Sequence, residues 1–374
     1  MDPSTSSERR EDDDEEEEQE KALCEWNFHL STLVATTAVN AAVSDTLGVI
    51  EIDPSEQILA TAGIARKIRI YSLRSLVGEN VINFIDGIRV TTKLDHSNAC
   101  EYYICTPAKL SSLRWRPDSS GRVMGAGDYD GVVTEYDLER RTAIFERDEH
   151  SGRRVWGVDY SKWSPVVGAS GSDDGTAQIW DTRGSGSVAT ICPGGAQPSP
   201  VCCVEFDPAG GPMIAVGSAD RKAYVYDARK MATPVAVFSG HRKTVTYARF
   251  VSGEAMVSAS TDGCLKQWRL LDARAVRTHR GHVNARRFVG LSAWRSGGLL
   301  ACGSETNEVY VYDKRWGQPI WVRHFKHSGG PECEQEFVSS VCWKQAGEED
   351  CTLVAGGSDG VLQIFVGRKK PIPK

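Results

Sequence analysis

The sequence of 374 residues has few features of a membrane protein, a secreted protein or an enzyme. It contains no run of 18 apolar residues, the length that a membrane-spanning helix requires, and its first residues do not form a signal peptide. HExxH, P-loop and helix-opening GxGxxG motifs are absent as well. We therefore expect a protein that neither spans a membrane nor is secreted, has no enzymatic activity, and uses no cofactor or metal.

Disulfides and zinc sites are also poorly supported. The eleven cysteines are an odd number, and no CxxC pair has zinc-site spacing. Several cysteines fall inside apolar stretches, where a thiol behaves as a small hydrophobic side chain: Cys202, Cys203, Cys264, Cys302 and Cys342. These positions favour reduced core thiols, as in the cytosol or nucleus, over a disulfide framework.

The charge is concentrated at the N-terminus. Residues 1–20 contain eleven acidic side chains and two arginines, a charge of −9, so a total of −6 leaves +3 for the remainder. Such a run predicts a disordered, self-repelling acidic tail, either solubilising or docking. The remainder has no basic stripe, so nucleic-acid binding is not expected. The expected organisation is a disordered acidic tail at 1–23, a folded domain at 24–366, and a short basic tail at 367–374.

One repeated unit dominates the rest of the chain. Residues 240–268 read GHRKTVTYARFVSGEAMVSASTDGCLKQW, with a Gly-His pair, an alternating apolar strand, a strand of small residues, an Asp-Gly turn and a closing tryptophan. Asp-Gly supplies the positive φ angles that a tight hairpin requires. We expect His241, Ser258, Asp262 and Trp268 to be linked by hydrogen bonds. The pattern is typical of one blade of a WD-repeat propeller.

Copies of this unit recur along the chain. Closing aromatic residues follow at 44, 46 and 42 residues from Tyr136 to Trp268, which is the spacing of propeller blades. Seven such positions are recognisable: Tyr71, Tyr136, Trp180, Tyr226, Trp268, Tyr312 and Phe365. The sequence therefore predicts an all-β fold, a seven-bladed WD-repeat β-propeller. The first copy is degenerate, because residues 64–67 replace its turn.

Two further features concern the closure of the ring. The last repeat ends at its third strand, so we expect the alternating residues 26–36 to complete the final blade and remove exposed sheet edges.

The long step of 65 residues from Tyr71 to Tyr136 predicts an excursion at residues 74–108, an outer strand plus a surface loop. An eighth blade hidden in it is the alternative, although it has no signature of its own.

Several positions have side chains that blade architecture does not require. Tyr129 lies in a turn, and Trp156 and Phe288 lie at blade entrances. Lys109, Arg221 and Lys243 occupy corresponding sites in other blades. Corresponding positions of a ring converge on one surface, so these residues predict a site for a short peptide with an apolar pair flanked by acids. The alternative is that the aromatics are strand-end core residues and the cations are solvated.

A family resemblance rests on LSSLRW, GDYDGVVTEYD, SGSDDGTAQIWDTR, VCCVEF, FSGHRKTVTYARF, SASTDGCLKQW and ACGSETNEVYVYDKR. These segments resemble the C-terminal propeller of the constitutively photomorphogenic (COP/SPA) plant regulators. A short acidic stretch running into EWNFHL, then ATAGIARKIRIYSL, resembles the short repressors of UV-B photomorphogenesis, the RUP proteins. The resemblance covers about residues 25–366.

The resemblance implies a function for the six face positions. In that family the top of the propeller captures a Val-Pro-containing peptide from photoreceptors and transcription factors. A residue-by-residue match with the family implies that peptide binding is carried out by five residues that retain the family's residue type: Lys109, Tyr129, Trp156, Lys243 and Phe288. Arg221 occupies a position at which the family differs, so the resemblance does not settle its role.

A second implied feature is a WDxR box at Trp180, Asp181 and Arg183. It resembles the motif by which WD-repeat substrate receptors dock on the DDB-type adaptor of cullin-RING ubiquitin ligases. YDAR at 226–229 and YDKR at 312–315 are weaker versions. The alternative is structural, because an arginine just past a strand end can also bond its own blade.

The resemblance thus implies a non-enzymatic adaptor in the nucleus and cytoplasm. It would bind the UV-B photoreceptor, return it to its inactive homodimer, repress UV-B signalling and displace the related photomorphogenic E3 ligase. The alternative is a substrate receptor of a cullin-RING ligase acting on light-signalling transcription factors, and a generic scaffold is the third possibility. Neither nucleic acid nor membrane is an expected partner.

Overall fold

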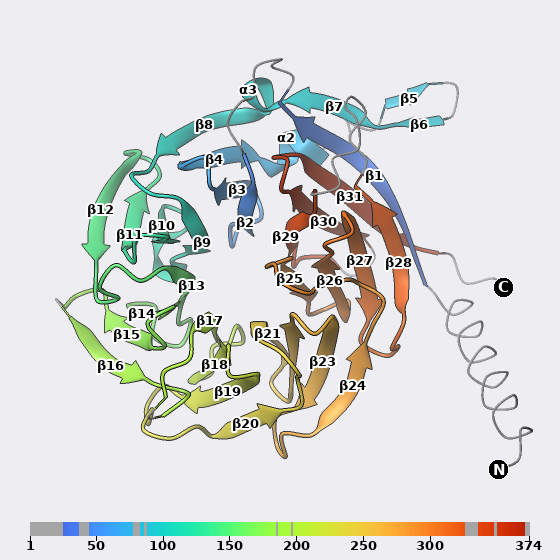
Figure 1. The fold of residues 1–374 in the computed structure, drawn as a ribbon. Coiled ribbons are helices and arrows are strands. Elements are labelled where there is room, and N and C mark those ends of the chain that lie inside the picture. Colours follow the sequence, from blue (N-terminus) through green and yellow to red (C-terminus); the bar gives the residue numbers. More distant parts are fainter. Residues whose placement is uncertain are drawn as a thin grey trace, which may run out of the picture.

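The strands of the chain form a ring of seven sheets, which confirms the predicted seven-bladed propeller (Figure 1). The computed structural model describes residues 25–36, 45–77, 83–85, 88–184, 186–195, 197–325, 336–347 and 350–370. The predicted acidic tail, residues 1–23, lies outside the described residues. None of the helices described is long and apolar enough to cross a membrane.

Each of blades one to six is an antiparallel meander of four strands. Blade one contains β2 (Leu47–Ile52), β3 (Ile58–Gly63), β4 (Lys67–Ser72) and β8 (Cys100–Cys105). Blade two contains β9 (Leu110–Trp115), β10 (Val123–Asp128), β11 (Val133–Asp137) and β12 (Thr142–Arg147). Blade three contains β13 (Val155–Tyr160), β14 (Val167–Ser172), β15 (Ala177–Asp181) and β16 (Ser187–Ile191).

The remaining blades repeat this order from the axis outward. Blade four contains β17 (Val201–Phe206), β18 (Met213–Ser218), β19 (Lys222–Asp227) and β20 (Ala236–Ser239). Blade five contains β21 (Val245–Ser252), β22 (Ala255–Ser260), β23 (Cys264–Arg269) and β24 (Ala275–His279). Blade six contains β25 (Leu291–Trp294), β26 (Leu299–Gly303), β27 (Glu308–Asp313) and β28 (Pro319–His324).

Blade seven is assembled from both ends of the chain. It contains β29 (Val338–Trp343), β30 (Asp350–Gly357), β31 (Leu362–Lys369), β1 (Trp26–Ala35) and β7 (Thr92–Asp95). The first strand pairs with the last in antiparallel register from Trp26 with Lys369 to Val34 with Leu362, which confirms the predicted closure. The predicted domain boundary at residue 366 falls inside β31, which continues to Lys369.

The long excursion between β4 and β8 forms part of two blades. It contains α2 (Leu73–Val77), the hairpin of β5 (Asn83–Ile85) and β6 (Ile88–Val90), β7 and α3 (His96–Ala99). Strand β8 is the predicted outer strand of blade one, whereas β7 pairs in parallel with β1 as a fifth strand of blade seven. Among the described residues the excursion therefore forms no eighth blade.

The turns between second and third strands have the backbone that the sequence pattern requires. Gly263, in the Asp-Gly turn of blade five, has φ of 76°. This region is easily reached by glycine because it has no Cβ atom. Blade four has Arg221 at the corresponding place, also with φ of 76°, so its backbone carries a strain that a glycine would not have.

Two blades contain the expected hydrogen-bonded network. In blade five, Trp268 donates its indole N–H to Ser258 Oγ at 2.7 Å, and His241 links Ser258 at 2.7 Å to Asp262 at 3.0 Å. In blade three, His150 lies 2.7 Å from both Asp174 and Ser170. These contacts tie an entrance loop, a strand and a turn together, so these histidines have structural partners.

The hydrophobic core is divided among the junctions between blades. The described residues form seven buried clusters, each made by two neighbouring sheets. At the junction of blades six and seven, for example, Trp294 packs near Trp343 and the β1 residue Trp26. All nine described cysteines are free thiols. Cys202, Cys203, Cys264 and Cys302 are buried in strands as predicted, whereas Cys342, also in a strand, is half-buried.

Candidate functional site

The six residues predicted for the face lie at one end of the ring. In each blade the start of the first strand pairs with the end of the second, as Val245 does with Ser260. Entrance loops and the turns after second strands therefore lie at the same end, which we call the top end. Lys109, Trp156, Lys243 and Phe288 belong to entrances, and Tyr129 and Arg221 to turns. The Tyr129 amide donates to the Lys109 carbonyl at 2.9 Å.

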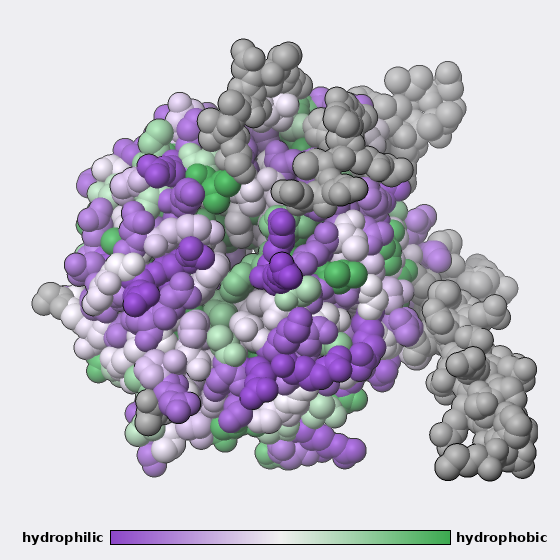
Figure 2. Space-filling view, in the orientation of Figure 1, coloured by the Kyte–Doolittle hydropathy of each residue, from purple (hydrophilic) through white to green (hydrophobic). Residues whose placement is uncertain are grey.

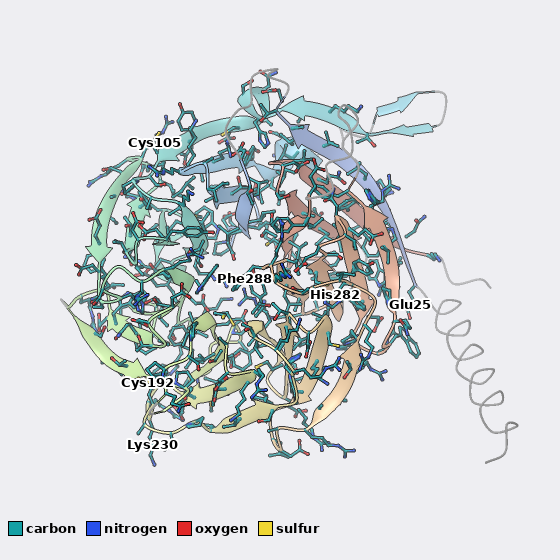
Figure 3. All side chains as sticks on the ribbon, in the orientation of Figure 1. Glu25, Cys105, Cys192, Lys230, His282 and Phe288 are labelled. Carbon is teal, nitrogen blue, oxygen red and sulfur yellow. The ribbon has the colours of Figure 1, made fainter. Side chains whose placement is uncertain are left out.

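Three predicted aromatic residues meet at the mouth of the ring. Trp156 stacks on Phe288 with ring centroids 4.3 Å apart and ring planes 9° apart. Tyr129 lies 6.2 Å from Trp156, and Tyr247 meets the edge of Phe288 at 5.8 Å. Because Trp156 belongs to blade three and Phe288 to the entrance of blade six, the stack crosses the ring, and Figure 3 places Phe288 near its centre. We call these four residues the aromatic cluster.

Arg154 is part of this site, although sequence reasoning missed it. Its guanidinium lies 4.2 Å from the Tyr129 ring centroid and 4.7 Å from that of Trp156, both within cation–π range. The Trp156 indole N–H donates to Asp173 at 2.6 Å, which fixes the ring orientation. The RRVW sequence that leads into β13 was a usable signal, because alternate residues of an extended segment share one face.

The predicted cations surround this cluster but do not all reach the cavity below it. Lys109, Arg221 and Lys243 are exposed and do not line the cavity, whereas Arg154, Arg286 and Arg287 do. Among the described residues, the exposed top-end cations whose side chains have no ion pair or hydrogen bond include Lys109, Arg153, Arg221, Arg242, Lys243 and Arg286. Figure 2 shows hydrophilic and hydrophobic residues interspersed around the centre of the ring.

The WDxR residues lie at the opposite end of the ring, which we call the bottom end. Trp180 is 1% exposed and packs against Tyr160, so its ring is part of the core. Asp181 and Arg183 form a forked ion pair at 2.6 Å, and the Arg183 side chain is 73% exposed. This pairing through side-chain and backbone hydrogen bonds lowers the pKa of Asp181 to about 2.

The same fork occurs at the third-strand ends of blades four and six, between Asp227 and Arg229 and between Asp313 and Arg315. In both blades the aspartate also accepts the backbone N–H of its arginine, so the pair holds the turn that follows the strand. These three bottom-end arginines are thus paired with carboxylates, unlike the top-end cations above.

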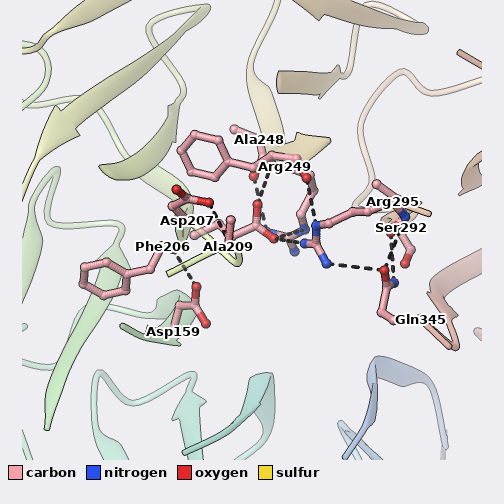
Figure 4. Close-up of polar contacts among 12 residues, drawn as sticks. Asp159, Phe206, Asp207, Ala209, Ala248, Arg249, Ser292, Arg295 and Gln345 are labelled. Carbon is pink, nitrogen blue, oxygen red and sulfur yellow. Dashed lines mark hydrogen bonds and ion pairs between the residues drawn. The ribbon is translucent and has the colours of Figure 1, made fainter. Parts of the chain in front are cut away.

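Beneath the aromatic cluster lies a central cavity of about 1160 Å³. Charged residues of the inner strands line its walls in mutual pairs. Arg114 contacts Glu51 at 2.6 Å and Asp159 at 3.1 Å, and Arg295 contacts Glu205 at 3.2 Å. Figure 4 shows the second of these groups with Asp159, Arg249 and Gln345.

Burial dominates the electrostatics of this channel. It raises the pKa of Glu51 and of Asp159, because the charged carboxylates lose solvent, although Arg114 opposes both shifts. Burial also opposes the charge of Arg114, but Glu51 and Asp159 outweigh it and raise the pKa of Arg114. Acids and arginines thus balance one another, so the channel wall is polar and nearly neutral.

The described part of the chain contains no cluster of three or more histidine, cysteine or acidic residues that could hold a metal. His282 sits at the entrance of blade six, where it pairs with the Tyr312 hydroxyl at 2.9 Å. Burial lowers the pKa of His282 to about 4, so the ring is neutral at physiological pH.

Comparisons with known proteins agree with this architecture. The family profile of the WD domain, G-beta repeat, matches residues 141–181 and 232–269. The WD repeat-containing proteins RUP2 and RUP1 of Arabidopsis thaliana are 60% and 55% identical to the chain, over 88% and 92% of it and 89% and 86% of their own lengths.

The chain is also 36% identical to the E3 ubiquitin-protein ligase COP1 of Arabidopsis thaliana, over 85% of this chain but only 44% of the ligase. The similarity therefore covers less than half of that protein. RUP2 and RUP1 share more than half of their residues with this chain over most of their length and of its length. The chain therefore belongs to the family of WD repeat-containing proteins that includes RUP1 and RUP2.

Proposed function

We propose that the protein is a non-enzymatic adaptor that binds the UV-B photoreceptor and represses UV-B photomorphogenic signalling in the nucleus and cytoplasm. Its top end holds a Val-Pro-containing segment of the photoreceptor's C-terminal tail. The family relationship to proteins named RUP1 and RUP2, and the similarity to the ligase COP1, support this proposal.

The observation that carries the proposal is the aromatic cluster with its surrounding cations. Trp156 and Phe288 provide flat apolar surface, and Tyr129 and Tyr247 flank them. An apolar dipeptide such as Val-Pro loses little conformational freedom on docking, because proline is already restricted. The unpaired top-end cations complement acidic residues beside it, which aids encounter and register more than affinity.

Binding would act on the photoreceptor through its differential affinity for two states. A ligand shifts an equilibrium only by its preference for one state over the other. If the propeller holds the tail while its flank contacts the photoreceptor core in a dimer-compatible arrangement, return to the inactive homodimer becomes more favourable. The same occupancy excludes the related ligase from the tail peptide, because one peptide cannot fill two propellers.

The test is a calorimetric titration of the purified protein with a Val-Pro photoreceptor-tail peptide. A control peptide carries Ala-Ala in place of Val-Pro. We expect saturable binding of the first peptide and at least a tenfold weaker association of the control, since an anchor in an interface contributes about 2 kcal/mol or more. Equal affinities for the two peptides would contradict the proposal.

The second candidate is a substrate receptor of a cullin-RING ligase for light-signalling transcription factors. The observation that favours it is the 73% exposure of the Arg183 side chain at the bottom end, away from the peptide site. Arg183→Ala separates the two functions. It should abolish capture of a DDB-type adaptor if the second function operates, and should leave photoreceptor redimerisation unchanged.

A further inference from the structure

Each blade has one turn residue whose backbone N–H is bonded to the entrance of the same blade. This residue comes just after the second strand, and we call it the anchored turn residue. In blade three, the Asp173 N–H donates to the Arg154 carbonyl at 3.0 Å, and in blade six the Glu305 N–H donates to the Val283 carbonyl at 2.8 Å. Five other residues make the same bond in the remaining blades: Ile64, Tyr129, Ala219, Thr261 and Ser358. The side chains of these residues therefore start from equivalent places at the top end.

The chemistry of this position differs between blades. Among the turns that the structure describes, those of blades three and six alone have an acidic anchored turn residue, Asp173 and Glu305. The same two blades supply the stacked rings of the aromatic cluster, Trp156 and Phe288. Each stacked ring is thus accompanied by a carboxylate from the turn of its own blade.

Asp173 acts on the Trp156 ring directly. Its carboxylate accepts the indole N–H at 2.6 Å. The neighbouring Asp174 already accepts from the turn and pairs with His150, so the hydrogen-bonded network of the blade does not include the Asp173 side chain. The outer torsion of an aromatic side chain has broad minima, so an acceptor at the ring edge selects one orientation. Here that orientation places the ring plane within 9° of the plane of Phe288.

Glu305 acts on Phe288 through the backbone. Its Oε1 atom accepts the N–H groups of the three residues before Phe288, at 2.7 to 2.8 Å: Ala285, Arg286 and Arg287. Burial opposes the charge of Glu305, but these hydrogen bonds outweigh it and lower the pKa of its carboxyl. Residues 284–290 contain no helix or strand, so this carboxylate supplies the hydrogen bonds that regular structure would otherwise provide.

The chain after Phe288 is fixed as well. The Val289 carbonyl accepts the Gly303 N–H at 2.9 Å. Gly290 has φ of 76°, and a Cβ atom there would lie 2.8 Å from the amide nitrogen of Val341. The Arg287 guanidinium also lies 4.2 Å from the ring centroid of Phe337 in blade seven. Phe288 is therefore held from both sides of the chain, with Glu305 on the N-terminal side.

We propose that Asp173 and Glu305 are positioning residues of the peptide site, and that each acts through one ring of the stacked pair. This inference rests on the proposed function. Asp173 sets the orientation of Trp156, and Glu305 sets the place of Phe288, so neither carboxylate needs to contact the peptide. Rings that are already oriented lose less freedom when a ligand binds, so the affinity for an apolar dipeptide depends on both acids.

Four single variants of the full chain test this assignment: Asp173→Ala, Asp173→Asn, Glu305→Ala and Glu305→Gln. Thr261→Ala is the matched control, because Thr261 is the anchored turn residue of blade five and has a neutral side chain. Each protein is titrated calorimetrically with the Val-Pro peptide, and thermal melts establish that it is folded. A second readout without peptide is the NMR signal of the Trp156 indole N–H, which is assigned by its loss in Trp156→Phe.

We expect each alanine variant to lose about tenfold in affinity, the size of one hydrogen bond to a charged group. Asp173→Asn and Glu305→Gln should stay within about threefold of the wild type, because an amide oxygen still accepts the same N–H groups. The control should bind like the wild type. The indole signal should move in Asp173→Ala, and much less in Asp173→Asn.

A double-mutant cycle separates positioning from a general effect on the fold. In the Trp156→Phe background the indole N–H is missing, so adding Asp173→Ala should cause no further loss of affinity. Adding Glu305→Ala to the same background should still weaken the peptide, because Glu305 acts through Phe288.

Two results would overturn the positioning role while leaving the proposed function in place. One is wild-type affinity in both alanine variants. The other is an equal loss from Asp173→Ala with and without the Trp156 indole. An unchanged indole signal in Asp173→Ala would also overturn the role of Asp173, whether or not peptide binds. If no Val-Pro peptide binds the wild type, the proposed function itself fails, and the two acids then position no peptide site.

Discussion

Replacing Trp156 by alanine is the sharpest test of the aromatic cluster. The substitution removes the stack on Phe288 at 4.3 Å, the cation–π contact with Arg154 at 4.7 Å and the hydrogen bond to Asp173 at 2.6 Å. The first two contribute roughly 0.5–1.5 and 0.5–1 kcal/mol in proteins generally. Trp156 is half-buried and lies above the central cavity rather than in a junction core, so neighbouring blades keep their packing.

The expected effect on binding is larger than the effect on folding. A buried tryptophan anchor contributes at least about 2 kcal/mol to association, which corresponds to about a thirtyfold loss of affinity for the Val-Pro peptide. The melting temperature should fall by only a few degrees, since a surface-end contact is lost and no blade junction is opened.

Calorimetric titration and a thermal melt on the same preparation give both quantities. Trp163→Ala is the matched control, because Trp163 belongs to the same blade, is 52% exposed, and lies in the turn between β13 and β14 at the bottom end. The control should bind the peptide like the wild type. Wild-type affinity in Trp156→Ala would refute the assignment of the peptide to this cluster.

Three further outcomes are expected. Lys243→Glu reverses an exposed top-end charge and should weaken an acidic Val-Pro peptide by about tenfold in the same titration, with an unchanged melt. Glu205→Ala removes the carboxylate partner of Arg295, leaves the buried Phe250 amide without its acceptor, and should cost about 3 kcal/mol or more in urea unfolding, whereas Glu205→Gln should cost less. Burial lowers the pKa of His282 to about 4 in the folded chain, so the unfolded chain binds a proton at higher pH. The free energy of unfolding should therefore decrease as the pH falls from 6.5 towards 4, by about 1–2 kcal/mol at pH 5. His282→Gln should make the free energy of unfolding less dependent on pH in this range.

The fold could be predicted because each blade repeats the same local chemistry. Asp262 and Gly263 specify a hairpin turn, and His241 and Trp268 specify the contacts that fix its loop, within about thirty residues of chain. Closure by β1 was predictable as well, since a last repeat with only three strands leaves an edge to cover.

The parts that sequence did not predict depend on which distant side chains meet. The pattern gave no sign that β7 would join β1, because four residues of one excursion carry too weak an alternation to name a partner sheet. Arg154 and Phe337 are likewise ordinary strand-entrance residues until Tyr129 and Arg287 are brought beside them. The pairing of strands within a blade depends on residues that are close in the sequence. The contacts around the mouth of the ring join residues that are far apart in the sequence, so the local pattern does not indicate them.

The pairing of β1 with β31 has a consequence for synthesis. Trp26 and Lys369, which face each other in the finished sheet, are 343 residues apart (369 minus 26). At about 5–20 residues per second, the ribosome needs about 17 to 70 s to produce the second after the first. During that interval the nascent β1 has no antiparallel partner, and six blades can form while the seventh waits. A chain that ends before β31 would therefore leave β1 without its antiparallel partner and the ring open at an exposed strand edge.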